Sequence, residues 1–270
     1  LSLGNKTLAF TETRMLHWPD SMFSYLKEER LLFSQDGFGM HLASEERFSD
    51  EVDQGLLDYE SATYFANILL PYANLITALL DKVKATGLAI DMIAPDHGPI
   101  WRRDLAVILD KYRAWSEQKP TRKAVVLYDT MWHSTERMAR AVEEGLREGG
   151  ARVQLMSMAA FHRSDVAYEI LDAGALVVGS PTLNNNIFPT VADVLTYLKG
   201  LRPKNLVGAA FGSYGWSGES ALQVNDILNE MKIEIAHEPV KCQYVPHEDS
   251  LAQCHAMGMK VARRLIEVAG

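Results

Sequence analysis

Short apolar runs alternate with amphipathic segments along the second half of the chain. The runs are rich in valine and end at glycine, proline or polar residues: 124–128, 153–156, 175–178, 207–211 and 240–245. Runs of this kind are typical of buried parallel strands. The segments between them carry apolar residues at helical spacing: 134–148, around 166–171, 191–201, 217–231 and 249–268. Five strand–helix repeats predict an α/β fold with a doubly wound parallel sheet.

The first part of the chain has a less regular pattern. Its candidate strands are separated by irregular stretches and cover residues 7–11, 31–34 and 90–93. Two helical patterns accompany them, at 61–85 with a kink or break near Pro71, and at 104–115. These elements fit a small α+β unit or half of a larger sandwich, and their pattern does not decide between the two.

A polar, proline-containing stretch at residues 116–122 separates the two patterns. Domain boundaries usually fall in such stretches. We therefore predict two domains, residues 1–118 and 119–270. The chain begins with Leu1 rather than methionine, so we expect a further segment to precede it.

Composition and charge narrow the possible function classes. The chain has 270 residues, of which 47% are hydrophobic and 23% charged, as in ordinary globular proteins. Its net charge of -8, without clustered lysine and arginine, disfavours nucleic-acid binding. The longest apolar stretch, residues 64–80, is interrupted by Asn67, Pro71 and Asn74, so we expect no membrane span. Cys242 and Cys254 form no CxxC pair, which argues against a zinc or rubredoxin module and favours a reducing, cytoplasmic location.

The turn after the first strand of the second domain offers groups that suit a phosphate. It reads Tyr128-Asp-Thr-Met-Trp-His-Ser-Thr135 and lacks the GxGxxG of dinucleotide-binding folds. Instead, Thr130, Ser134 and Thr135 place three hydroxyls beside the free N–H groups of a helix N-terminus, an arrangement that favours a phosphate monoester. The alternative is that Ser134 or Thr135 serves only as the helix N-cap.

Two further turns follow later strands of the same predicted sheet. Residues 179–189 follow the third strand and residues 211–219 follow the fourth. Open α/β sheets bind ligands at the carboxyl ends of their strands. The side chains of Trp132, Tyr214 and Trp216 could stack on a flat ring there.

These three turns resemble those of the FMN-binding domain of flavodiiron proteins, also called A-type flavoproteins and typified by rubredoxin:oxygen oxidoreductase. The resemblance implies a C-terminal flavodoxin-like domain that holds FMN, with the first turn around the phosphate and the other two beside the isoalloxazine. It assigns cofactor binding to the following residues: Thr130, Met131, Trp132, His133, Ser134, Thr135, Pro181, Thr182, Leu183, Asn184, Asn185, Ser213, Tyr214, Gly215 and Trp216.

Three candidate metal ligands lie in the first domain. His17, Asp36 and His97 each follow an apolar segment and sit in a turn-rich loop, so all three could meet at one rim of a sheet. Two imidazoles and a carboxylate suit iron, zinc or manganese. Their spacing along the chain does not by itself establish a site.

The flavodiiron resemblance extends through residues 1–118. It implies the second part of a metallo-β-lactamase-like αββα sandwich with two non-haem irons, in which His17 and His97 each ligate one iron and Asp36 bridges them. Tyr64 is similar to the tyrosine that lines this pocket in the family, or is a helix-packing aromatic. The family's HxExDH motif occurs nowhere in the chain, so we expect an incomplete ligand set for the two irons.

The resemblance implies an oxidoreductase that passes electrons from a rubredoxin-like carrier through FMN to the diiron site. That site would reduce dioxygen to water, nitric oxide to nitrous oxide, or both. The resemblance also implies a head-to-tail homodimer or a homotetramer. Two alternatives are an FMN-binding electron-transfer module without a functional metal site, and a metal-dependent hydrolase with a flavodoxin tail.

Overall fold

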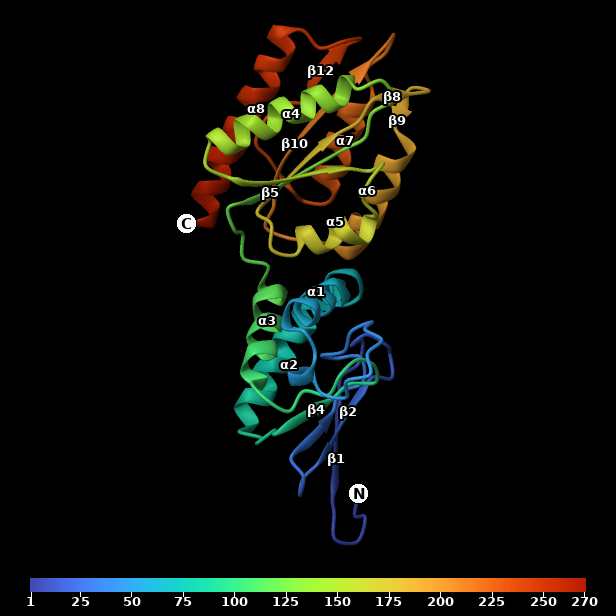
Figure 1. Cartoon of the computed structure of the whole chain (residues 1–270), viewed down its shortest axis with the longest axis vertical. Helices are drawn as coiled ribbons and strands as arrows, with labels where there is room; N and C mark the ends of the chain where they lie inside the picture. The colour runs from blue at the N-terminus through green and yellow to red at the C-terminus, as the bar shows by residue number, and fades with distance from the viewer. The chain divides into compact units, whose positions relative to one another are not determined.

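The computed structural model describes all residues from Leu1 to Gly270. The chain divides into two compact units, Leu1–Glu117 and Gln118–Gly270 (Figure 1). Each unit has its own sheet, four-stranded in the first and six-stranded in the second. The two units are therefore described separately.

The sheet of the first unit has the strand order β1-β2-β3-β4 and is antiparallel except for the β3–β4 pair. Its strands are β1 (Leu8–Glu12), β2 (Met22–Leu26), β3 (Leu31–Phe33) and β4 (Met92–Ala94). Three of them confirm the predicted strands. Strand β2 was not among the predicted strands, because its alternation of buried Phe23 and Tyr25 with polar Ser24 covers only five residues.

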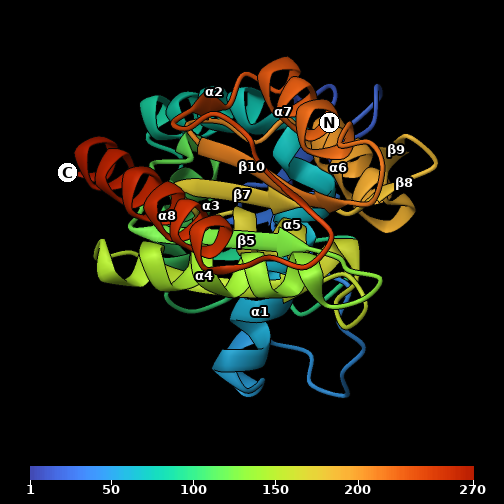
Figure 2. The ribbon, with the colours of Figure 1, turned by 90° about the horizontal axis from the view of Figure 1, so that it is seen from above.

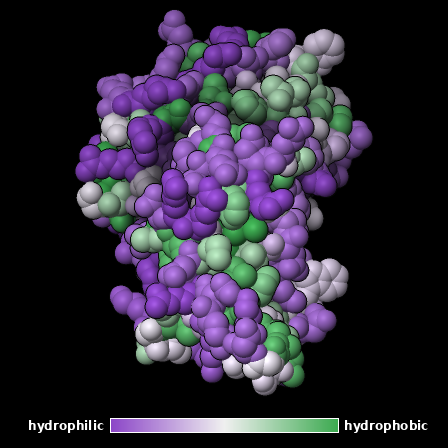
Figure 3. Space-filling view, turned by 60° about the horizontal axis from the view of Figure 1, so that its bottom comes forward, coloured by the Kyte–Doolittle hydropathy of each residue, from purple (hydrophilic) through white to green (hydrophobic).

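One face of this sheet is buried and the other is open to solvent. Phe23 and Tyr25 are buried on the first face. Ser24 pairs with Phe10 on one side and with Phe33 on the other, so these three residues share the second face. Phe10 is 47% exposed and Phe33 is 41% exposed. Apolar patches are visible among polar ones in the space-filling view (Figure 3).

The helices of the first unit are α1 (Gln54–Tyr64), α2 (Ala73–Thr86) and α3 (Leu105–Glu117). Two short segments join α1 to α2, a wide turn at Phe65–Leu69 and a tight turn at Leu70–Tyr72. These two turns confirm the predicted break near Pro71. Proline has no N–H to donate, so it interrupts the hydrogen bonding of a continuous helix. The tract from 54 to 86 is long and apolar enough to cross a membrane, a test that a soluble core helix also passes. Phe65 and Ala66 are fully buried.

The second unit is built on a parallel sheet in which β10 pairs with β7 on one side and with β11 and β12 on the other. Its order is β6-β5-β7-β10, followed by β11 and β12. The strands are β5 (Lys123–Tyr128), β6 (Arg152–Ser157), β7 (Ala175–Gly179), β10 (Val207–Tyr214), β11 (Glu234–Ile235) and β12 (Val240–Gln243). The five predicted strands are confirmed, but the last ends two residues early, because Tyr244 takes a left-handed φ of 59°.

Helices cover both faces of this sheet (Figure 2). They are α4 (Ser134–Glu148), α5 (Arg163–Ile170), α6 (Pro189–Leu201), α7 (Ser220–Glu230) and α8 (Glu248–Ala269). α4 and α8 lie side by side on one face, and α6 and α7 lie on the opposite face (Figure 2). The doubly wound arrangement and all five predicted helices are thus confirmed.

The backbones of α4 and α8 approach each other at two glycines. A Cβ atom at Gly145 would collide with the carbonyl oxygen of His255, and one at Gly258 with that of Val142. Both obstacles are helix backbone, which cannot rotate away as a side chain can. The two helices therefore need glycine at both positions to pack this closely.

We predict that Gly258→Ala lowers the free energy of unfolding of the second unit by about 1–3 kcal/mol, because the new methyl group forces the two helices apart. Gly200→Ala in α6 is the matched control, since no atom lies within 4 Å of its added Cβ. The control is expected to raise stability by about 0.5–1 kcal/mol. Urea unfolding measures both, and equal effects would contradict the packing argument.

Candidate functional site

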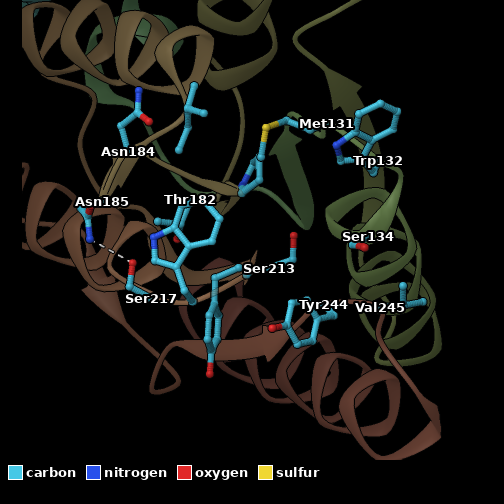
Figure 4. Close-up of a pocket in the computed structure, with 15 residues that line it drawn as sticks. Met131, Trp132, Ser134, Thr182, Asn184, Asn185, Ser213, Ser217, Tyr244 and Val245 are labelled. Carbon is cyan, nitrogen blue, oxygen red and sulfur yellow. Dashed lines mark hydrogen bonds between the residues drawn. The ribbon is translucent and has the colours of Figure 1, made fainter.

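A pocket of about 440 Å³ opens at the carboxyl ends of the strands in the second unit. It is lined by Met131, Trp132, Ser134, Pro181, Thr182, Leu183, Asn184, Asn185, Ser213, Tyr214, Gly215, Trp216, Ser217, Tyr244 and Val245. Figure 4 shows Asn184 and Asn185 on one side, Trp132 and Ser134 on the other, and Ser213 between them. The three turns singled out from the sequence thus surround one cavity.

The turn after β5 leaves hydrogen-bonding groups free. His133 precedes the first residue of α4 with a left-handed φ of 63°, and no side chain caps the helix. The alternative that Ser134 or Thr135 is only an N-cap is therefore wrong. The hydroxyl oxygen of Thr130 is buried and has no hydrogen-bond partner. An uncapped helix N-terminus and an unpaired hydroxyl together suit an anion such as a phosphate.

Thr130, His133 and Thr135 lie outside the pocket lining. The hydroxyl of Thr135 is fully buried and lies 2.8 Å from that of Ser213, which ties α4 to β10. The His133 side chain turns to Glu136, with Nδ1 2.8 Å from its carboxylate. For these three residues, a contact with a cofactor stays a prediction.

The turn after β7 folds into a small hairpin of β8 (Thr182–Leu183) and β9 (Asn186–Ile187). Asn184 and Asn185 connect the two strands with left-handed φ angles of 49° and 61°. Asparagine tolerates this region better than most residues, and two such residues in a row match the twist of a tight hairpin.

Large aromatic side chains stand at the mouth of the pocket. Trp132 is 86% exposed and Trp216 is 84% exposed, and they come from different turns. Exposed indoles beside a mostly apolar cavity suit a flat ring. Together with the free phosphate-binding groups, the residues fit a phosphorylated flat ring such as FMN.

Three lining residues were not predicted: Ser217, Tyr244 and Val245. Tyr244 and Val245 were not predicted because their side chains extend the apolar run of the predicted strand at 240–245 past the true end of β12. Tyr244 leaves the strand, and its N–H donates to the Tyr214 carbonyl at 2.7 Å. The available signal was position, since both residues follow a strand at the same edge of the sheet.

In the first unit, the predicted metal ligands lie together around one carboxylate. His17 Nε2 is 3.4 Å from one oxygen of Asp36, and His97 Nε2 is 3.1 Å from the other. Each imidazole thus reaches its own oxygen, as a carboxylate shared by two metal ions requires. The chain contains no group of three or more His, Cys, Asp or Glu side chains arranged to hold one ion. His17, Asp36 and His97 therefore fit an incomplete set of ligands for a two-metal site.

Two aromatic side chains border this cluster. Tyr64 is buried, and its hydroxyl lies 3.4 Å from His97 Nε2. Burial raises the pKa of Tyr64, and the Asp36 carboxylate raises it further, so the phenol remains a proton donor. His41 was not predicted, although its ring lies 5.2 Å from that of His97 and 4.9 Å from that of Tyr64. Its closeness to Asp36 in sequence was the available signal.

Comparisons with known proteins support the relationship of both units to known families. The family model for flavodoxin matches residues 126–258, and that for the ODP family beta lactamase matches residues 1–98. A nitric oxide reductase of Moorella thermoacetica is 50% identical over 99% of this chain and 67% of its own length. The chain belongs to the flavodiiron protein family.

Other members of the family extend this comparison. The rubredoxin-oxygen oxidoreductase of Megalodesulfovibrio gigas is 46% identical over 98% of this chain and 66% of its own length. The solved rubredoxin oxygen:oxidoreductase from Desulfovibrio gigas covers 99% of this chain, and this chain covers 67% of it, with a TM-score of 0.97 and 46% identity. The match to the solved flavodiiron protein from Giardia intestinalis covers 100% of this chain and 66% of that protein. Its TM-score is 0.92 and the two sequences are 33% identical. The chain thus spans about two thirds of the length of these relatives.

These matches confirm the fold class expected for a flavodiiron protein. The second unit is flavodoxin-like, and the first is related to the metallo-β-lactamase fold.

We predict opposite effects for two threonines of the phosphate turn in the FMN-free chain. Thr130→Val removes an unpaired hydroxyl, so it leaves the free energy of unfolding unchanged or raises it by up to about 1 kcal/mol. Thr135→Val breaks the contact with Ser213 and lowers it by about 1–2 kcal/mol. Urea unfolding distinguishes the two variants. A loss of stability in Thr130→Val as large as in Thr135→Val would show that the Thr130 hydroxyl is paired.

Proposed function

We propose that this chain forms part of an oxidoreductase that uses FMN and a non-haem diiron site. Electrons would pass from a small rubredoxin-like carrier through FMN to the irons, where dioxygen is reduced to water, nitric oxide to nitrous oxide, or both. One observation carries the proposal. The chain combines a pocket suited to a phosphorylated flat ring with two imidazoles that reach opposite oxygens of one carboxylate.

In the second unit, the residues of the pocket would bind and orient FMN. Thr130, Ser134 and the open N–H groups of α4 would hold the phosphate, and the indoles of Trp132 and Trp216 would cover the ring and exclude water. FMN, when bound, supplies the ability to take up electrons one at a time. The protein contributes position and electrostatic environment.

In the first unit, His17, Asp36 and His97 would hold iron, which supplies the electrons for reducing a small oxidant. Tyr64 keeps its proton near His97 and would offer a hydrogen bond inside this site. Two irons need more donors than these three side chains provide. The complete site therefore requires further ligands.

We also propose, from the family resemblance, a cytoplasmic head-to-tail homodimer or homotetramer. The flavin residues and the metal residues belong to different units of the chain, and a head-to-tail dimer would bring the flavin residues of one subunit beside the metal residues of the other. Both cysteines are free and buried, which is compatible with a reducing compartment.

A second candidate function is an FMN-binding electron-transfer module without a working metal site. It is favoured by the absence of any three-donor group. Visible spectra and metal analysis of the purified chain test both candidates. Flavin bands with bound iron support the oxidoreductase, and flavin without metal supports the module. Zinc without flavin would contradict both.

We predict that Ser134→Ala weakens FMN binding about tenfold or more, because a hydrogen bond to a charged phosphate contributes about 1.5–3 kcal/mol. Equilibrium titration with FMN, followed by flavin fluorescence, measures the dissociation constant. Ser250→Ala, outside the pocket lining, is the control and is expected to bind as the wild type does. If Ser134→Ala binds FMN as tightly as the control, Ser134 does not contact the phosphate.

We predict that Asp36→Asn, made in the full-length protein that contains the further iron ligands, abolishes iron-dependent reduction of dioxygen or nitric oxide and leaves bound flavin photoreducible. The amide nitrogen cannot ligate a metal, so one of the two shared donor atoms is lost. Iron content, oxygen consumption and flavin photoreduction are measured on the same sample. Asp20→Asn, an exposed residue close in sequence, is the control. Full activity in Asp36→Asn would show that this carboxylate is not shared by the irons.

A further inference from the structure

The two turns on one side of the flavin pocket are joined by hydrogen bonds around Asn185. Its side-chain nitrogen donates to the Ser217 hydroxyl at 3.0 Å and to Glu219 Oε1 at 3.1 Å. Gln223 of α7 completes the connection, since it donates to the Asn185 carbonyl at 3.1 Å and accepts from the Ile187 N–H at 3.0 Å. The hairpin is thereby held against the turn after β10.

Glu219 is held as an anion in this cluster. The hydrogen bond from Asn185 lowers its pKa most, and one from Ser217 lowers it further. Glu219 also stands directly before the first residue of α7, where the helix dipole stabilises a carboxylate. Lys241 of β12 adds a weaker attraction. The second carboxylate oxygen, Oε2, is buried and has no hydrogen-bond partner.

This anion lies directly behind the wall of the pocket. Asn185 and Ser217 both line the cavity and are hydrogen-bonded to each other (Figure 4). Both also hydrogen-bond to Glu219. No Asp, Glu, Lys, Arg or His side chain belongs to the lining itself. Because Oε2 is closed to solvent and the adjacent cavity is uncharged, water screens this charge less than it would screen that of a fully exposed carboxylate.

We propose that Glu219 is a positioning residue for the flavin that also lowers its reduction potential. This inference rests on the proposed FMN site. The carboxylate holds the Asn185 side chain in place and puts one negative charge behind the ring. When an external reductant gives the flavin one electron and no proton follows, the ring gains one negative charge, which the Glu219 anion disfavours.

The test compares variants of the full chain loaded with FMN. Glu219→Gln removes the charge but keeps an oxygen that can accept from Asn185. Glu230→Gln is the matched control, because it removes the same charge from the other end of α7, where Glu230 pairs with Lys199. Asn185→Ala breaks the hydrogen bonds and leaves the carboxylate. Potentials are measured by dithionite titration in a spectroelectrochemical cell at pH 8.

Glu219→Gln is expected to favour electron uptake about tenfold, which corresponds to an upward shift of about 59 mV for a one-electron step. Glu230→Gln is expected to shift the same equilibrium less than about twofold. Asn185→Ala is expected to lose FMN more readily without the upward shift, which separates the positioning role from the charge.

Unchanged potentials in Glu219→Gln, with FMN retained, would overturn the inference. An upward shift in Glu230→Gln as large as that in Glu219→Gln would also overturn it, because the effect would then reflect net charge alone. A wild-type chain that binds no FMN would contradict the proposed function itself, and this result is distinguishable from the other two.

Discussion

The flavin pocket depends on the close contact of β7 and β10 at their carboxyl ends. A side chain at Gly212 would collide with the Ser180 carbonyl, so the two strands meet there without room for a Cβ atom. Ser180 is fully buried, and its carbonyl accepts from the Ser220 hydroxyl while its own hydroxyl accepts from the Phe188 N–H. One junction therefore fixes the start of the hairpin, the start of α7 and the end of β10. The hairpin with the residue before it, the end of β10 and the turn that follows β10 supply most of the residues that line the cavity.

A different constraint organises the first unit, where polar side chains meet around one shared group. The Asp36 carboxylate brings His17 and His97 together, although the two histidines are 80 positions apart in the sequence. Tyr64 comes from the end of α1, just before the helix widens into a π-type turn at Phe65–Leu69. Such turns are often found at functional sites.

Features that depend on the periodicity of apolar residues could be predicted from the sequence. Features that depend on a short signal, on a local backbone angle or on contacts between distant residues could not. Helix α4 could be placed residue by residue, because its amphipathic pattern is strong. Strand β2 could not, because its signal is only five residues long. The apolar run at 240–245 predicts a strand that includes Tyr244, since the sequence does not show the left-handed φ of this residue. No pattern in the sequence singles out Glu219, because its proposed role depends on a contact with Asn185, which lies 34 residues away in the chain.

The absence of charged side chains from the pocket lining has a consequence for how a phosphate would be held there. A site built on lysine or arginine loses affinity as salt screens the ion pairs. Here the available donors are hydroxyls and the N–H groups at the start of α4, which are neutral. Retention of a phosphorylated ligand is therefore expected to change little with ionic strength, so that the cofactor would stay bound while the salt content of the surroundings varies.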